Sequence, residues 1–188
     1  PHLQGQLDAG LGLGRKLSLI SAPAGFGKTT LTSAWVSQHG QAAAWLSLDE
    51  QDNDLTRFLI YLVTTLQRSA ARQTESVAFG TSVLALLQAP QPPATQSILT
   101  TLVNEMTQLP NQVILVLDDY HLIELPEIDQ ALTFLLEHQP LLSQLLTHQL
   151  PPHKPLLRQL MPRQPLQHQP LHHQLLRRQQ LRRLALIH

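Results

Sequence analysis

The apolar positions of the chain predict short strands that alternate with helices. Residues 113–117 read Val-Ile-Leu-Val-Leu, with no polar position, which is typical of a parallel strand buried on both faces. Shorter apolar runs predict two more strands, at residues 17–21 and 42–48. Strands alternating with helices predict an α/β fold with a parallel sheet flanked by helices.

Four helices are expected from apolar residues that recur at helical spacing. One covers residues 29–39, with Gly40 after it as a stop, and another begins after Asp54, which can cap its first turn. A third begins at Thr95 and a fourth at Pro126. The stretch 68–93 is less regular and is interpreted as a loop, because prolines interrupt its second half.

The composition changes abruptly after Glu137. Residues 1–138 contain all 13 acidic residues and six of the 13 Lys and Arg, a formal charge of −7, whereas residues 139–188 carry +7. The second segment consists largely of Leu, Gln, Pro, His and Arg and has no Gly. We therefore predict a domain at 1–138 and a low-complexity tail at 139–188 without a settled fold. A shifted reading frame or a fused unrelated sequence is a hypothesis for the tail.

A glycine-containing loop separates the first strand from the first helix. It reads Ala22-Pro-Ala-Gly-Phe-Gly-Lys-Thr29, which differs from the usual P-loop by Ala in place of the first Gly. Gly25 and Gly27 allow successive N–H groups to face a polyphosphate at the start of a helix. Lys28 is then expected to reach the outer phosphates and Thr29 to bind Mg²⁺. The alternative is a glycine-rich turn without a ligand.

Two carboxylates follow the most apolar strand. A P-loop needs an acidic residue from a neighbouring strand to hold its metal ion, and Asp118 fits this requirement. Asp119 can polarise the attacking water if hydrolysis occurs. The alternative is that the pair only caps the following turn. Together with the loop, the pair predicts a domain that binds a nucleoside triphosphate.

Three segments in this order resemble the ATPase domain of MalT-like regulators. They read SAPAGFGKTTL, AWLSLDEQDND and VILVLDDYHLIE, and the resemblance covers residues 3–138. These regulators are LuxR-family transcriptional activators of the STAND class of P-loop NTPases. The resemblance implies Asp118 as metal ligand beside Thr29, and Asp119 and Lys28 as catalytic residues. It implies a nucleotide-binding loop of Ala24, Gly25, Phe26, Gly27, Lys28, Thr29 and Thr30.

The resemblance also implies a function, which is an ATP-binding regulatory switch with slow hydrolysis and with ATP and Mg²⁺ as cofactors. It implies cytoplasmic location, nucleotide-dependent self-association, and contact with DNA through a C-terminal domain that this chain lacks. Members of the family have a further apolar strand in the middle of the sheet after the helix that ends near Glu137. The corresponding segment here, LLSQLLTHQL, has no β-branched run, so we expect an incomplete sheet without its middle strand.

Two other function classes stay open, a free-standing P-loop ATPase or kinase and a fragment that does not hydrolyse nucleotide. The chain has no cysteine, which excludes thiolate metal sites and cysteine nucleophiles, and no apolar run long enough for a membrane span. Residues 49–54 resemble a cation loop superficially, but helix capping is favoured. The tail histidines 168, 172 and 173 and its arginines 177, 178, 182 and 183 are interpreted as solvated sequence.

Overall fold

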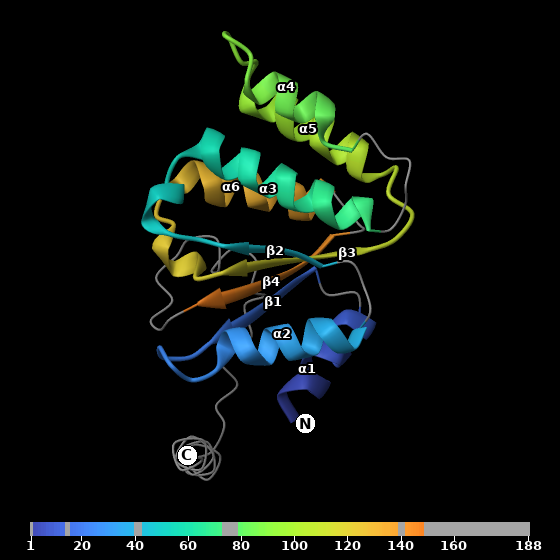
Figure 1. The fold of residues 1–188 in the computed structure, drawn as a ribbon, viewed down its shortest axis with the longest axis vertical. Helices are drawn as coiled ribbons and strands as arrows, with labels where there is room; N and C mark the ends of the chain where they lie inside the picture. The colour runs from blue at the N-terminus through green and yellow to red at the C-terminus, as the bar shows by residue number, and fades with distance from the viewer. Residues whose placement is uncertain (1, 14–15, 40–42, 73–78, 139–141, 149–188) are drawn as a thin grey trace, which may run out of the picture.

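A computed structural model describes residues 2–13, 16–39, 43–72, 79–138 and 142–148. These residues form a four-stranded sheet with helices on both faces (Figure 1). In chain order the elements are α1 (His2–Gly12), β1 (Leu17–Ser21), α2 (Lys28–His39), β2 (Ala43–Ser47), η1 (Glu50–Asp52), α3 (Leu55–Ala71), α4 (Thr81–Leu87), α5 (Thr95–Met106), β3 (Val113–Asp118), η2 (Tyr120–Leu122), α6 (Pro126–His138) and β4 (Leu142–His148).

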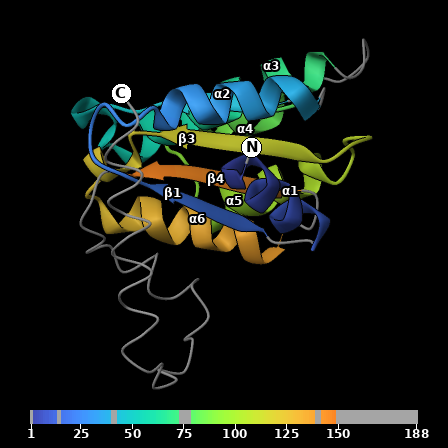
Figure 2. The ribbon, with the colours of Figure 1, turned by 90° about the horizontal axis from the view of Figure 1, so that it is seen from below.

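All strands of the sheet are parallel, and their order is β1-β4-β3-β2. Strand β4 lies between β1 and β3 and pairs with both, as Figure 2 shows. Its residue Leu145 lies opposite Ser18 on one side and opposite Val116 on the other. The expectation that this sheet lacks its middle strand is therefore wrong. The rest of the tail, residues 149–188, lies outside the described residues.

The prediction failed because it relied on the low β propensity of the β4 sequence. Tertiary context decides strand formation more than propensity does. A gap between β1 and β3 would leave the backbone N–H and C=O groups of both strands without ladder partners. Strand β4 supplies these partners along its length. The segment is a strand because of where the fold places it, between two strands that need pairing.

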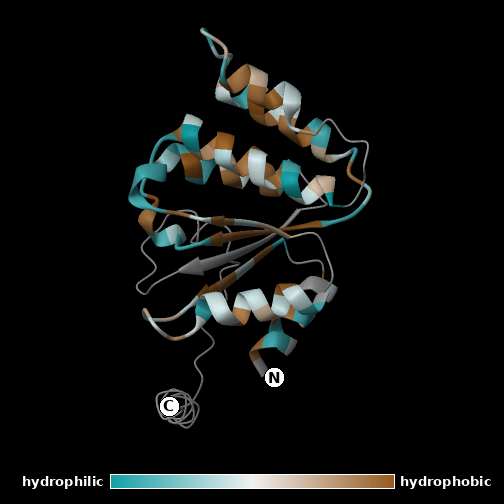
Figure 3. Ribbon diagram, in the orientation of Figure 1, coloured by the Kyte–Doolittle hydropathy of each residue, from teal (hydrophilic) through white to brown (hydrophobic). Residues whose placement is uncertain are grey.

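Strand β3 divides the core into two halves, because its side chains alternate between the faces of the sheet. Val113, Leu115 and Leu117 join the core under α3, α5 and α6, whereas Ile114 and Val116 pack with Trp35 of α2 and Leu7 of α1. Every residue of β3 is buried, and β2 and β3 are largely apolar in Figure 3. The prediction of a strand covered on both faces is confirmed.

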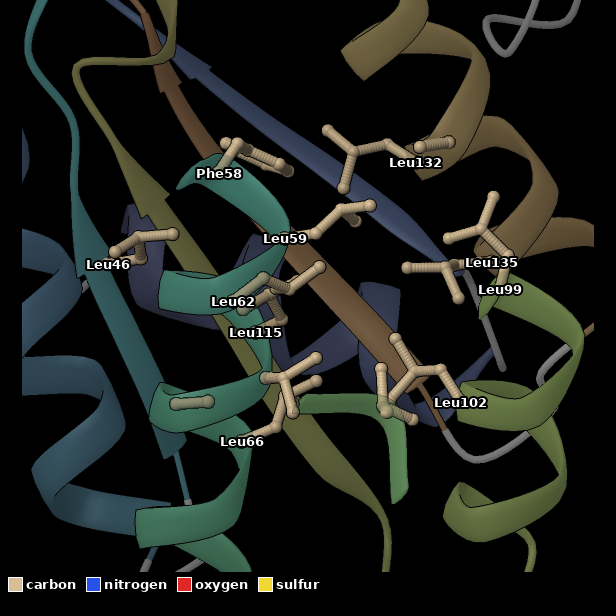
Figure 4. Close-up of a cluster of buried hydrophobic side chains, with 14 of the residues drawn as sticks. Leu46, Phe58, Leu59, Leu62, Leu66, Leu99, Leu102, Leu115, Leu132 and Leu135 are labelled. Atoms are coloured by element: carbon tan, nitrogen blue, oxygen red, sulfur yellow. The ribbon is translucent and has the colours of Figure 1, made fainter. Parts of the chain in front are cut away.

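The larger half of the core gathers leucines from several helices over the sheet (Figure 4). Helices α3 and α6 lie directly on this face, and α4 and α5 lie beyond them, farther from the sheet (Figure 1). Helix α5 reaches the same core through Leu99 and Leu102, which are 4% and 0% exposed. The labelled side chains in Figure 4 are those of Leu46, Phe58, Leu59, Leu62, Leu66, Leu99, Leu102, Leu115, Leu132 and Leu135.

The structure contains two helices that the sequence pattern did not predict. Helix α4 lies within the stretch interpreted as a loop, and α3 extends into that stretch as far as Ala71. Helix α1 contains three glycines, which are poor helix formers. It is held by tertiary contacts, since Leu7 is buried and Trp35 Nε1 donates a hydrogen bond of 2.7 Å to Asp8 Oδ1.

Candidate nucleotide site

The glycine-containing loop connects the carboxyl end of β1 to the first turn of α2. Gly25 and Gly27 have φ angles of 80° and 73°, in the left-handed region that other residues rarely adopt. The loop therefore has a backbone that depends on its glycines, and it leads into the positive end of a helix dipole. This arrangement suits an anionic ligand such as a phosphate chain.

Lys28 is the first residue of α2 and is buried, at 8% exposed. Its ammonium group bends back over the loop, where Nζ donates hydrogen bonds to the carbonyl oxygens of Ala22 (3.0 Å) and Pro23 (3.2 Å). The next turn of the helix is held by Thr32, whose hydroxyl donates to the Lys28 carbonyl oxygen at 2.9 Å. The positive charge of Lys28 therefore lies against the backbone of the loop.

Thr29 connects the loop with β3, two strands away in the sheet. Its hydroxyl donates a hydrogen bond of 2.9 Å to Asp118 Oδ2, across 89 residues of sequence. Asp118 ends β3 and is 4% exposed, and its carbonyl oxygen accepts a bond of 3.1 Å from Leu48 N. The structure brings together the hydroxyl and carboxylate oxygens that Mg²⁺ prefers as ligands.

Asp119 begins the turn that follows β3. Its φ of 55° is left-handed, and no other residue except glycine has a positive φ in the described part of the chain. Its side chain is 46% exposed, and its Oδ1 lies 3.7 Å from His121 Nδ1, an ion pair when the histidine is protonated. The backbone reversal turns Asp119 away from the strand direction while Asp118 stays buried. The two adjacent carboxylates therefore have different surroundings.

The remaining residues predicted for the loop are exposed. Ala24, Phe26 and Thr30 lie on the surface, and the Phe26 side chain is 60% exposed. Phe26 lies between Gly25 and Gly27, both of which have left-handed backbone, so the Phe26 N–H is part of the turn. The structure places these three residues in the loop and the first turn of α2, and their part in binding stays a prediction.

The acidic segment after β2 caps helices. Asp49 forms a capping box at η1, where its side chain accepts from Gln51 N at 2.8 Å, and Asp54 caps α3 by accepting from Arg57 N at 2.7 Å. Asp52 is buried and pairs with Arg57, with 3.2 Å between Oδ1 and Nε. The prediction that these acids cap helices is confirmed. In the described part of the chain, no group of three or more His, Asp or Glu side chains is arranged to hold a metal ion.

Sequence reasoning did not single out Asn53, which joins the loop after β2 to the loop after β3. Its side chain makes hydrogen bonds with backbone groups of Leu122, Glu124 and Leu125, about 70 residues away. The residue lies in the segment AWLSLDEQDND, between Asp52 and Asp54. An amide that both donates and accepts, in the loop that follows a strand, was the available indication.

Several other expectations concern residues whose structure is not described. The tail histidines and arginines named above lie within residues 149–188. In the described ranges no helix has the length and apolar character needed to cross a membrane.

Comparison with known proteins finds relatives that match most of the described part of this chain. The HTH-type transcriptional regulator MalT of Cronobacter sakazakii (strain ATCC BAA-894) is 39% identical to this chain over 138 residues. The matched part makes up 72% of this chain and 14% of that protein, so the chain spans a small part of its relative's length. No protein-family model matches the chain.

Proposed function

Because the chain belongs to the MalT-like regulators, of which it carries the ATPase domain, we propose that it is an ATP-binding switch module that hydrolyses ATP slowly. The observation that carries this proposal is the hydrogen bond between Thr29 and Asp118. It joins the glycine-containing loop to the strand end that supplies a buried carboxylate. A turn without a ligand has no need of a carboxylate at this position, since burying one is costly.

The residues present suit a nucleotide with its metal ion. Backbone N–H groups between Gly25 and Thr29 would donate hydrogen bonds to phosphate oxygens. Lys28 would donate to a phosphate in place of the carbonyl oxygens of Ala22 and Pro23. Thr29 and Asp118 would hold Mg²⁺, which neutralises charge on the phosphates when bound. Asp119, whose carboxylate is more exposed, would accept a proton from the attacking water.

The rest of the regulator's activity is proposed on the same basis. We expect the module to change its contacts with other parts of the regulator, or with a second copy, when ATP replaces ADP. Contact with DNA would then belong to a different part of the regulator.

Substitution of Lys28 tests the site. Lys28→Ala removes a charge-assisted contact to phosphate, which is worth about 1.5–3 kcal/mol, so the affinity for MgATP should fall about 10- to 100-fold. The measurement is a titration of the purified chain with a fluorescent ATP analogue, with and without Mg²⁺. Arg68→Ala is the matched control, because Arg68 is an exposed cation in the last turn of α3.

Three results of this titration, with phosphate release from ATP measured in parallel, are informative. Equal binding by the wild type and Lys28→Ala would contradict the proposed site. Binding by the wild type without phosphate release would leave the binding site and remove the hydrolytic step. An equal loss of affinity in Arg68→Ala would show a general effect of charge rather than a site at Lys28.

A further inference from the structure

The loop that carries Asp119 and His121 has little regular structure of its own. The helix η2 is three residues long and ends with the bond from Ile123 N to the Tyr120 carbonyl oxygen, 3.2 Å, and Glu124 and Leu125 lie outside the helices before α6 begins. The start of the loop is held by β3 and by the bond from Leu48 N to the Asp118 carbonyl oxygen, 3.1 Å. The far end therefore needs support from another part of the molecule.

Asn53 supplies this support with both ends of its side-chain amide. Its Oδ1 accepts from Glu124 N at 2.6 Å and from Leu125 N at 3.1 Å. Its Nδ2 donates to the carbonyl oxygens of Leu122 at 2.7 Å and Glu50 at 3.2 Å. Two donors and two acceptors are thus in use, which is the full hydrogen-bonding capacity of an asparagine side chain.

Asn53 is itself held in place on both sides. It is the C-cap residue of η1, and its N–H donates to the Glu50 carbonyl oxygen. The preceding Asp52 is buried, accepts from Asp49 N at 3.0 Å and pairs with Arg57. The following Asp54 caps α3. The amide of Asn53 is therefore presented to the loop from a rigid base.

From these contacts we infer that Asn53 is a positioning residue for Asp119 and His121. It fixes the end of their loop against the loop after β2, and so fixes where the Asp119 carboxylate stands relative to Asp118. The inference rests on the proposed function in one respect, since Asp119 matters for turnover only if the module hydrolyses ATP. The placement of the His121 ring depends on Asn53 in either case.

The first test reads the position of His121 without nucleotide. Asn53→Ala removes all four hydrogen bonds of the side chain, so the ring resonances of His121 in the NMR spectrum of the full chain should move. Asn53→Asp keeps an acceptor for Glu124 N and Leu125 N but loses both donors, and it serves as the second variant if Asn53→Ala does not fold. The control is Asn104→Ala, because Asn104 is exposed on α5.

The second test separates positioning from nucleotide binding. Asn53→Ala should slow phosphate release in a single turnover by about 10- to 100-fold, the usual cost of displacing a catalytic group by about 1 Å. The affinity for MgADP should stay within about threefold of the wild type, because Asn53 makes no contact with the P-loop among its hydrogen bonds.

Each result bears on the role of Asn53 as a positioning residue. Unmoved His121 resonances in both variants would overturn it, and so would moved resonances with phosphate release equal to that of the wild type. If the wild type binds nucleotide but releases no phosphate, the proposed hydrolysis fails, and the His121 resonances alone decide the role of Asn53.

Discussion

At the scale of single residues, the two carboxylates at the end of β3 differ in backbone as well as in exposure. Asp118 continues the strand, whereas Asp119 adopts a left-handed conformation that costs most side chains about 1 kcal/mol or more. Asp and Asn tolerate this conformation better than other residues because their short polar side chains bond locally. The backbone preference and the proposed chemistry can therefore be separated by substitution.

Asp119→Asn should keep the fold and the affinity for MgATP, because Asn accepts the left-handed backbone and has nearly the same shape. It should lower the rate of phosphate release by about 10²- to 10⁴-fold, because an amide cannot accept the proton of the attacking water. The measurements are phosphate release in a single turnover and a thermal unfolding curve. Asp119→Ala is the companion variant, in which strain should also lower stability. A normal rate in Asp119→Asn would exclude Asp119 as the base.

At the scale of elements, Tyr120 joins the turn after β3 to helix α6. Its side chain is fully buried, and its hydroxyl donates a hydrogen bond to Asp129 Oδ1 of α6. Burial raises the pKa of Tyr120 far above its ordinary value of 10.0, and the hydrogen bond and the charge of Asp129 raise it further. The turn that carries Asp119 is thus packed onto a helix through a phenol that must stay protonated.

The stability of the protein should therefore depend on pH in the alkaline range. Since the folded pKa of Tyr120 lies above the unfolded one, the contribution is complete below about pH 10 and is lost as the pH rises further. The slope from this group approaches about 1.4 kcal/mol per pH unit. Urea unfolding at several pH values checks this, with Tyr120→Phe expected to show a shallower decline.

Tyr61→Phe is the matched control for the pH series, because Tyr61 lies on the surface of α3 at 41% exposed. It should follow the wild type at every pH. A wild-type curve that runs parallel to that of Tyr120→Phe above pH 10 would contradict the assignment of the alkaline loss to Tyr120.

At the scale of the whole molecule, the sheet depends on a strand that comes from the segment after residue 138. Strand β4 is the neighbour of both β1, which leads into the glycine-containing loop, and β3, which carries Asp118. The hydrogen bond from Thr29 to Asp118 must span the end of β4. The proposed nucleotide site is thus formed on both sides of a strand that itself contributes none of the predicted site residues.

Leu145→Pro should abolish cooperative unfolding and nucleotide binding together. Proline removes a ladder hydrogen bond and is tolerated poorly in a central strand, and a normal domain has a free energy of unfolding of only about 5–15 kcal/mol. Circular dichroism during heating measures the effect. Thr95→Pro is the control, because it places proline at the first position of α5, after Ala94, whose ψ of 140° is outside the helical region. A cooperative transition in Leu145→Pro would argue against β4 as a central strand.

The local pattern predicted strands β1, β2 and β3 and helices α2, α3, α5 and α6, whose apolar residues are continuous or regularly spaced. Strand β1 and the cap at Asp54 agree with the structure, and β3 and α6 begin where predicted. Helices α1 and α4 were missed, since the first is rich in glycine and the second is short and lies between irregular segments. Such helices are stabilised by packing, as Trp35 and Leu7 show for α1, and packing partners cannot be read from neighbouring positions.

The sequence by itself determined the chemistry of the loop and of the strand end, because glycines, a lysine, a threonine and two aspartates specify what can be bound wherever they lie. The tertiary structure decided which of these groups meet. It placed Thr29 against Asp118 across 89 residues, Asn53 against the loop after β3, and β4 between β1 and β3. Contacts between distant segments arise from the closing of the sheet, and local propensity carries no record of them.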